Sequence, residues 1–247
     1  MVAMLLNGSP QLPDKLTTIS PWIDCNLTDE SEVRETLAAQ SGRRVIKTHT
    51  PADGFPVWLN VTLVAVYRHP LDVFLSIRKH VANMKAVGDD HPMRASISGS
   101  LQFYLNNPLE PDDIDRDSLE LLVHHYDSVL TREWPDTVVL HYADMIADHK
   151  GAVENLARAL AVEAPPSLID AIVDATSFGE MKTAAETFAP ESGTGIWHDE
   201  SAFFASGGAN KWRGKLTERQ VGNYAERLAE VAPDPDVRSW LEDGYRP

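Results

Sequence analysis

The feature that most restricts the fold of this chain is a buried strand pattern that changes directly into a helix pattern. Residues 61–67 are nearly all apolar and rich in β-branched side chains, as in a strand buried on both faces of a parallel sheet. Pro70 suits the first position of a helix expected to reach about Met84, because its ring fixes φ and it has no N–H. This succession predicts an α/β protein with a right-handed, mostly parallel sheet that is flanked by helices.

Similar strand and helix patterns alternate along the rest of the chain. Residues 1–6 resemble the last turns of a helix that is capped by Gly8. Further strands are expected to begin at Arg44 and to cover residues 137–142. Further helices are expected over residues 29–40, 118–133, 145–160, 167–175, 178–186 and 217–230. Residues 189–210 lack any period and predict a long loop of the kind that covers a site.

The length and the composition predict one domain over residues 1–247. A chain of 247 residues with 43% hydrophobic residues can fill the core of one large α/β domain. The net charge of −15 argues against a nucleic-acid partner, because such a partner needs a broad basic surface. Seven of the 22 Lys and Arg residues nevertheless lie between Arg43 and Lys85, which leaves a small anionic ligand open.

The sequence also predicts where the protein works. The apolar run at the N-terminus is too short for a signal peptide or a membrane span, and Cys25 is the single cysteine. A cytoplasmic protein without a membrane span is expected, and a homo-oligomer is left open. No metal site is predicted, because His124 and His125 are adjacent on a helix pattern and point in different directions.

Polar residues follow the strand patterns at the edge of the sheet where parallel α/β proteins bind ligands. Lys47 and His49 follow the first strand, Arg68 follows the second, and Tyr142 ends the third. A histidine near neutral pKa suits a general base, and Arg68 with Ser76 suits a phosphate. Taken singly, His49 fits a hydrogen-bonded loop residue better than a base, and Arg68 with Ser76 fits a surface salt bridge and a helix-facing serine as well as a phosphate site.

Five segments in sequence order resemble the sulfotransferase family that uses 3′-phosphoadenosine 5′-phosphosulfate (PAPS). Residues 46–49 resemble its K-T-H segment, and residues 67–76 its R-[NH]-P-x-D-x-x-x-S element. Residues 142–145 resemble Y-E-D-M, and residues 176–181 resemble T-S-F-x-x-M. Residues 203–217 resemble the nucleotide-covering loop R-K-G-x-x-G-D-W-[KR]-x-x-x-[FL]-T.

The resemblance implies the P-loop NTPase-like sulfotransferase fold, PAPS as the sulfuryl donor and its product PAP as the bound nucleotide after transfer. It implies that His49 is the general base and that Lys47 assists at the sulfuryl group. The acceptor is expected to be a small alcohol, phenol or amine. The residues that the resemblance assigns to nucleotide binding are Arg68, Ser76, Tyr142, Thr176, Phe178, Gly207, Trp212 and Arg213.

The chain departs from the family pattern at two places. The family begins with a strand and a loop Y-P-[KR]-S-G-T-T-W that cradles the 5′-phosphosulfate, and neither is found in this sequence. Ala205 and Ser206 also stand where the covering loop has Arg-Lys, so that Lys211 or Arg213 would have to compensate. The missing loop predicts weakened turnover, because it supplies charge-assisted donors of about 1.5–3 kcal/mol each.

Two other functions fit parts of the pattern. The first is a catalytically impaired protein that binds PAP for regulation or assembly. The second is a relative of the P-loop kinases, which is disfavoured because no G-x-x-x-x-G-K-[ST] occurs. The sequence does not identify the acceptor, because the acceptor pocket is expected to be formed by variable loops within residues 84–117 and 189–201.

Overall fold

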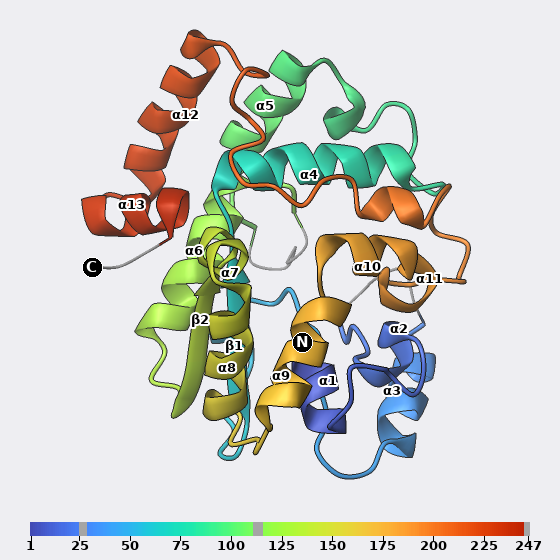
Figure 1. Cartoon of the computed structure of the whole chain (residues 1–247). Helices are drawn as coiled ribbons and strands as arrows, with labels where there is room; N and C mark the ends of the chain where they lie inside the picture. The colour runs from blue at the N-terminus through green and yellow to red at the C-terminus, as the bar shows by residue number, and fades with distance from the viewer. Residues whose placement is uncertain (25–28, 111–115, 245–247) are drawn as a thin grey trace. The chain divides into compact units, whose positions relative to one another are not determined.

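A computed structural model describes residues 1–24, 29–110 and 116–244 (Figure 1). Cys25 and the centre of the acidic stretch 106–117 lie outside the described residues. The chain divides into two compact units, each assembled from two stretches of sequence. The first unit comprises Met1–His49 and Asp148–Gly207, and the second comprises Thr50–Ala147 and Gly208–Pro247.

The first unit is helical within the described residues. Its α1 ends as predicted at Gly8, whose φ of 64° is the left-handed conformation that glycine adopts without strain. Its α3 begins after Asp29, whose carboxylate accepts a hydrogen bond from the Ser31 N–H at 2.8 Å. The elements are α1 (Val2–Asn7), α2 (Leu16–Ile19), α3 (Glu30–Ala39), α8 (His149–Ala159), α9 (Pro166–Ala175), α10 (Phe178–Thr183), α11 (Ala185–Phe188) and η3 (Ser201–Phe203).

The prediction of a strand that begins at Arg44 is wrong. The described residues form an isolated parallel bridge there, between Trp22 and Lys47. The Ile23 N–H donates to the Lys47 carbonyl, and the Lys47 N–H donates to the Pro21 carbonyl, both at 3.0 Å. The physical reason is that the apolar run is very short, and its Ile46 is 44% exposed, so little apolar area is buried by extending the ladder.

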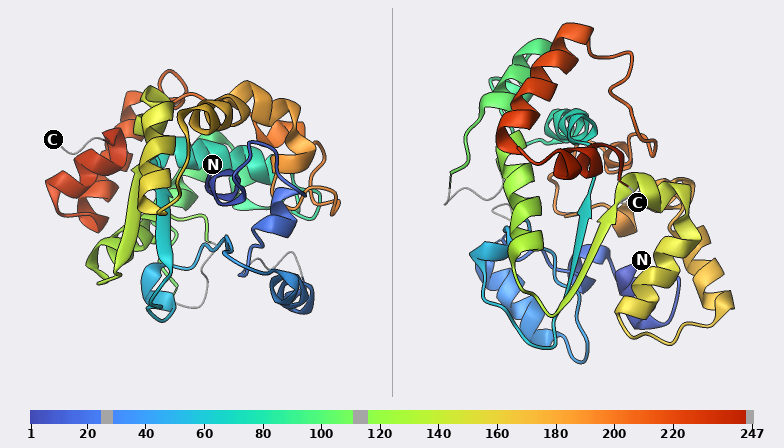
Figure 2. Two further views of the ribbon diagram at one scale, coloured as in Figure 1. Left: turned by 60° about the horizontal axis from the view of Figure 1, so that its bottom comes forward. Right: turned by 90° about the vertical axis from the view of Figure 1, so that its left-hand side faces the viewer.

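The second unit contains a parallel sheet of two strands, which confirms the α/β class. Strands β1 (Thr62–Tyr67) and β2 (Asp136–His141) pair in register from Thr62 opposite Asp136 to Tyr67 opposite His141. Figure 2 shows the two arrows side by side and pointing the same way. Each strand therefore ends at the same edge of the sheet.

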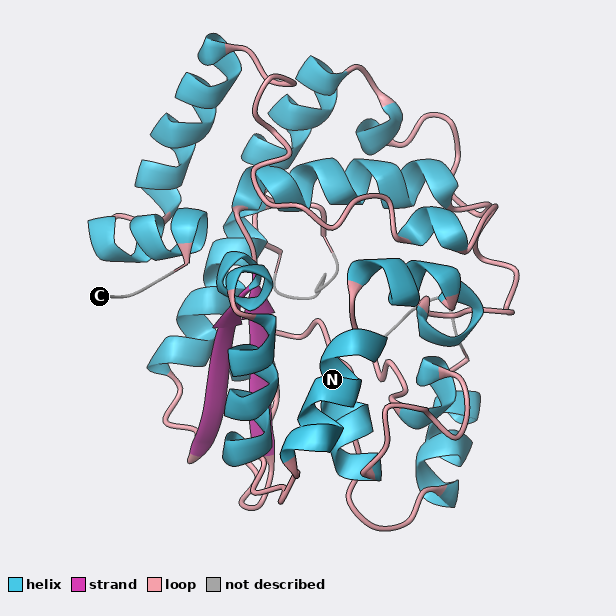
Figure 3. Ribbon diagram, viewed as in Figure 1, coloured by secondary structure: helices cyan, strands magenta, loops and turns pink. Residues whose placement is uncertain are grey.

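Apart from this pair of strands, the elements of the second unit within the described residues are helices (Figure 3). α4 begins at Pro70 as predicted, and the η1, η2, α5 and α13 segments are additions to the predicted set. The helix expected over residues 145–160 is instead two helices, because the Asp148 carboxylate caps a new start by accepting from the Gly151 N–H. The helical elements are η1 (Ala52–Gly54), α4 (Pro70–Asn83), η2 (Pro92–Arg94), α5 (Ile97–Asn106), α6 (Leu119–Thr131), α7 (Tyr142–Ala147), α12 (Glu218–Val231) and α13 (Pro235–Asp243).

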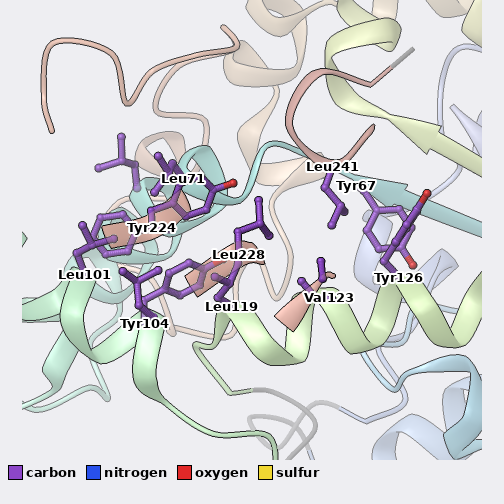
Figure 4. Packing of buried hydrophobic residues seen from close by; sticks show 14 of the residues in the cluster. Tyr67, Leu71, Leu101, Tyr104, Leu119, Val123, Tyr126, Tyr224, Leu228 and Leu241 are labelled. Carbon is purple, nitrogen blue, oxygen red and sulfur yellow. The ribbon is translucent and has the colours of Figure 1, made fainter. Parts of the chain in front are cut away.

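One hydrophobic core holds the second unit together. Aromatic side chains from α5, α6 and α12 fill it, and Tyr104, Tyr126 and Tyr224 are almost fully buried (Figure 4). Leu71 and Phe74 of α4 are completely buried in the same cluster. Burial of each such side chain contributes about 1.5–3 kcal/mol, so the first turns of α4 are firmly anchored beside the strand ends.

No helix in residues 1–24, 29–110 and 116–244 has an apolar stretch long enough to cross a bilayer.

Candidate active site

Arg68 and Tyr142 directly follow the two strands of the second unit. Tyr67 and His141 are the last residues of the paired strands, and they are opposite each other in the register. Arg68 and Tyr142, which follow these two residues, are therefore held close to each other. The Arg68 guanidinium lies over the Tyr142 ring, with its carbon 4.4 Å from the ring centroid. This pair confirms the prediction that both residues lie at the same edge of the sheet.

Asp72 organises the surroundings of Arg68. Its side chain is completely buried and lies one turn into α4, where it accepts from Arg68 at 3.3 Å. Its second oxygen accepts from the Trp212 backbone N–H at 3.3 Å. Arg68 also donates to the Gly208 carbonyl at 2.5 Å. The buried carboxylate thus links the start of α4 to residues 208–212 of the covering loop.

Two buried donors in this cluster have no hydrogen-bond partner among the described residues. They are the Arg68 Nε and the Trp212 indole nitrogen. A buried unsatisfied donor costs about 1–3 kcal/mol, and more when it is charged, so unpaired donors of this kind point to a missing acceptor. The chemistry of the donor set, a guanidinium Nε–H and an indole N–H, fits an anion such as a phosphate.

Ser76 lies one turn beyond Asp72 on α4, as the family element predicts. Its hydroxyl donates to the Asp72 carbonyl at 2.9 Å, so in this structure it does not point a donor toward Arg68. Arg213 lies over the Trp212 ring, with the guanidinium carbon 4.8 Å from the centroid. Both side chains are placed in the second unit with Arg68, and their contacts to a phosphate stay predictions.

His69 separates Arg68 from α4 and is buried without a charge. Its Nδ1 accepts from the Leu71 N–H at 3.2 Å, which makes it the cap of α4. Only 6% of the residue is exposed, and burial lowers the pKa of its imidazole to about 4. The imidazole is therefore neutral in the folded protein at neutral pH, and His69 adds no positive charge next to Arg68 in the chain.

The buried His69 predicts a measurable loss of stability in acid. His69 takes up a proton near pH 6.5 in the unfolded chain but only near pH 4 in the folded protein. Its contribution to the free energy of unfolding is therefore full above pH 6.5 and falls as the pH drops toward 4. The slope from this residue is at most about 1.4 kcal/mol per pH unit. His69→Asn keeps a capping acceptor but does not titrate. We expect urea unfolding at pH 7, 6 and 5 to show a shallower decline in the variant, and equal slopes would refute the assignment.

Lys47 and His49 lie in the first unit, beside two residues that the sequence pattern did not single out. The His49 N–H donates to the Asp24 carboxylate at 3.0 Å, and the Thr48 hydroxyl donates to the same carboxylate. The His49 ring lies 4.3 Å from the Trp22 ring, measured between centroids, and the Lys47 ammonium lies 3.5 Å above that indole. The hydrogen bond to Asp24 holds the backbone of His49, and the half-buried ring of His49 packs against Trp22.

The sequence contains only a weak indication that Trp22 and Asp24 contact residues 47–49. Trp22 and Asp24 belong to a short segment after Pro21 that has neither a strand pattern nor a helix pattern. An aromatic and an acid at alternate positions of an extended segment share one side, which is the signal that could have paired them with residues 47–49. Whether Lys47 and His49 act together with Arg68 stays a prediction, because they belong to the other unit.

Thr176, Phe178 and Gly207 also lie in the first unit. The Thr176 hydroxyl donates to the Ile172 carbonyl at 2.6 Å and contacts the His149 Nε2 at 3.0 Å. Phe178 is the first residue of α10, and it is 40% exposed. A Cβ on Gly207 would approach the Phe178 ring to 2.7 Å, so the glycine is what allows the loop to lie against this ring. Their contact with an adenine stays a prediction.

The comparisons with known proteins agree with this fold. The structure of a mouse sulfotransferase complexed with PAP superimposes with a TM-score of 0.68 at 20% identity, over 88% of this chain and 76% of that chain. Retinol dehydratase in a complex with retinol and PAP gives 0.70 at 17% identity, over 95% of this chain and 76% of that chain. The arrangement is therefore that of the α/β sulfotransferases.

Sequence comparison gives the family. The model of the sulfotransferase domain matches residues 6–233. A glycolipid sulfotransferase of Mycobacterium bovis is 30% identical over 278 aligned positions, which cover all of this chain and 84% of the relative. The 3-beta-hydroxysteroid sulfotransferase of Cavia porcellus is 24% identical, over 87% of this chain and 71% of that protein. The chain belongs to the sulfotransferase family.

Proposed function

We propose that this sulfotransferase takes the sulfuryl group from PAPS and that His49 is its general base. The observation that supports PAPS as the sulfuryl donor is the cluster of Arg68, Asp72 and Trp212, where the Arg68 Nε–H and the Trp212 indole N–H are buried without a hydrogen-bond acceptor among the described residues. An anionic phosphate supplies such an acceptor. The similarity to structures that contain PAP supports the same donor.

The nucleotide-binding residues of each unit have different tasks in this proposal. Arg68, Ser76 and Arg213 bind the 3′-phosphate, Tyr142 and Trp212 line the site around it, and Thr176 and Phe178 hold the adenine. The exposed Phe178 ring provides an apolar face on which a base can stack, and Gly207 allows the loop to reach that ring. When bound, PAPS supplies the electrophilic sulfur and a phosphate leaving group.

His49 accepts the proton of the acceptor hydroxyl or amine. As the proton leaves, the acceptor oxygen or nitrogen forms the new bond to sulfur, and the bond from sulfur to the phosphate oxygen breaks. Lys47 offsets the negative charge that develops on that leaving oxygen, as cations do in phosphoryl transfer. Asp24 fixes the backbone N–H of His49, which orients the ring for proton transfer.

We propose a hydroxyl or an amine of a small molecule as the acceptor, with glycolipids as the first class to test. The support is the similarity over the whole chain to curated relatives that are named glycolipid sulfotransferases. Steroid alcohols are the second class, because the Cavia porcellus relative is named for a hydroxysteroid. A phenol and an amine complete the set.

A transfer assay tests the proposal. The chain is incubated with PAPS labelled with ³⁵S and with a glycolipid, a steroid alcohol, a phenol or an amine, and labelled product is separated from donor. We expect acceptor-dependent labelling and release of PAP in equal amounts. PAP binding without labelling of any acceptor would favour a PAP-binding protein without catalysis over the enzyme. The absence of PAP binding would refute the proposal that PAPS is the sulfuryl donor.

A further inference from the structure

A basic groove lies along α4 in the second unit. Its volume is about 790 Å³, and its apolar lining includes Leu75 and Ile97. Four cationic side chains line it: Arg78, Lys79, Arg94 and Lys215. For a protein with a net charge of −15, this is a strong local concentration of positive charge.

The two arginines of the groove already bind backbone carbonyls. Arg78 donates to the Ala95 carbonyl at 2.7 Å, and Arg94 donates to the carbonyls of Val81 and Met84 and pairs with Asp89 at 3.1 Å. Their role is thus to hold the chain around the groove. Lys79 and Lys215 carry the positive charge that is exposed at its surface.

The lysines lie on the same side as the Arg68 cluster. Asp72, Ser76 and Lys79 follow one another on α4 at spacings of four and three residues, which places them on one face of the helix. Lys211 and Lys215 are four residues apart in a turn whose Leu216 N–H donates to the Trp212 carbonyl at 3.2 Å. Both elements meet at Asp72, because Asp72 accepts from the N–H of Trp212, the residue after Lys211.

Electrostatic coupling agrees with this placement. Partial burial lowers the pKa of Lys211 to about 8, and repulsion from Arg68, Lys79 and Lys215 adds to the effect, opposed by Asp72. The pKa of Lys79 is lowered by burial and then by Lys215 and Arg68. Four cations therefore repel one another around a single carboxylate, and a bound dianion would relieve that repulsion.

We propose that Lys79, Lys211 and Lys215 bind the 3′-phosphate together with Arg68, and so replace the cations that the covering loop lacks at Ala205 and Ser206. The inference rests on the proposed donor. The loop pattern that the chain resembles has Arg-Lys at those two positions and Asp at the position of Lys211. Loss of two positive charges and replacement of one negative charge by a positive one leave the formal charge of the loop unchanged.

Calorimetric titration with PAP and with adenosine 5′-phosphate (AMP), which lacks the 3′-phosphate, tests the proposal. Lys79→Gln, Lys211→Gln and Lys215→Gln are compared with the wild type. Each is expected to lose about tenfold in PAP affinity, as for one charge-assisted contact, while AMP affinity is unchanged. Lys211→Arg keeps the charge and should retain PAP affinity. The exposed Lys85→Gln is the matched control, and both nucleotides should bind it as they bind the wild type.

The outcomes separate this inference from the proposed donor. Wild-type protein that binds PAP more tightly than AMP, with the same preference in all three glutamine variants, would overturn the lysine assignment and leave the donor standing. Wild-type protein that shows no PAP binding would overturn both. Thermal unfolding of each variant confirms that it is folded, because these exposed or half-exposed lysines contribute little to the core.

Discussion

Replacing His49 by alanine is expected to lower the rate of sulfuryl transfer by about 100- to 10,000-fold, because a well-placed general base contributes that much. PAP affinity is expected to stay unchanged, since the ring of His49 is not assigned to nucleotide binding. Initial rates with labelled PAPS and the best acceptor measure the first quantity, and calorimetry measures the second. The variant removes the ring and keeps the backbone N–H that binds Asp24.

The matched control for this prediction is His124→Ala. His124 lies on α6 and pairs at 3.1 Å with Asp53, in a contact that is about half exposed and worth at most about 1 kcal/mol. Its removal is expected to leave the transfer rate within about twofold of the wild type, as for most surface substitutions. A His49→Ala enzyme that retained the wild-type rate would exclude the base assignment. Parallel losses of rate and of PAP affinity would indicate a structural role instead.

The sequence predicted the second unit well. The Val-rich run before Arg68 and the proline at the start of α4 are local signals that leave few alternatives, and β1 and α4 formed where expected. The burial expected on both faces of β1 is wrong, since its Val66 is 53% exposed. The Thr217 start of α12 was equally clear, because its side chain and Gln220 form a reciprocal capping box. Strong local patterns of this kind need no tertiary information.

Other features depend on contacts that a local pattern does not contain. The run at Val45 and Ile46 has the residue types of a strand, yet among the described residues only an isolated bridge between Lys47 and Trp22 forms there, because a longer ladder would bury little apolar area. Asp24 was missed since its partners at residues 48 and 49 are distant in sequence. α5 was missed because its pattern is mixed, and packing of Leu101 and Tyr104 into the core stabilises it.

The link between Arg68 and Asp72 yields the prediction with the largest effect on stability. Arg68→Ala removes the cation that pairs with a completely buried carboxylate, and it also leaves the Gly208 carbonyl without that donor. Removing one partner of a buried ion pair costs about 3–5 kcal/mol, because the remaining charge has no compensation. We therefore expect the free energy of unfolding of Arg68→Ala, measured in urea at pH 7, to fall by about this amount.

The double variant Arg68→Ala/Asp72→Asn separates stability from binding. Asparagine has no charge that needs a partner, and its oxygen can still accept from the Trp212 N–H, so about 2 kcal/mol of the lost stability should return. PAP affinity should not return, because the guanidinium that binds the phosphate is still missing. Equal stabilities of the single and double variants would show that the Asp72 charge is compensated elsewhere. Recovery of PAP affinity in the double variant would show that Arg68 only positions Asp72 and does not bind the phosphate itself.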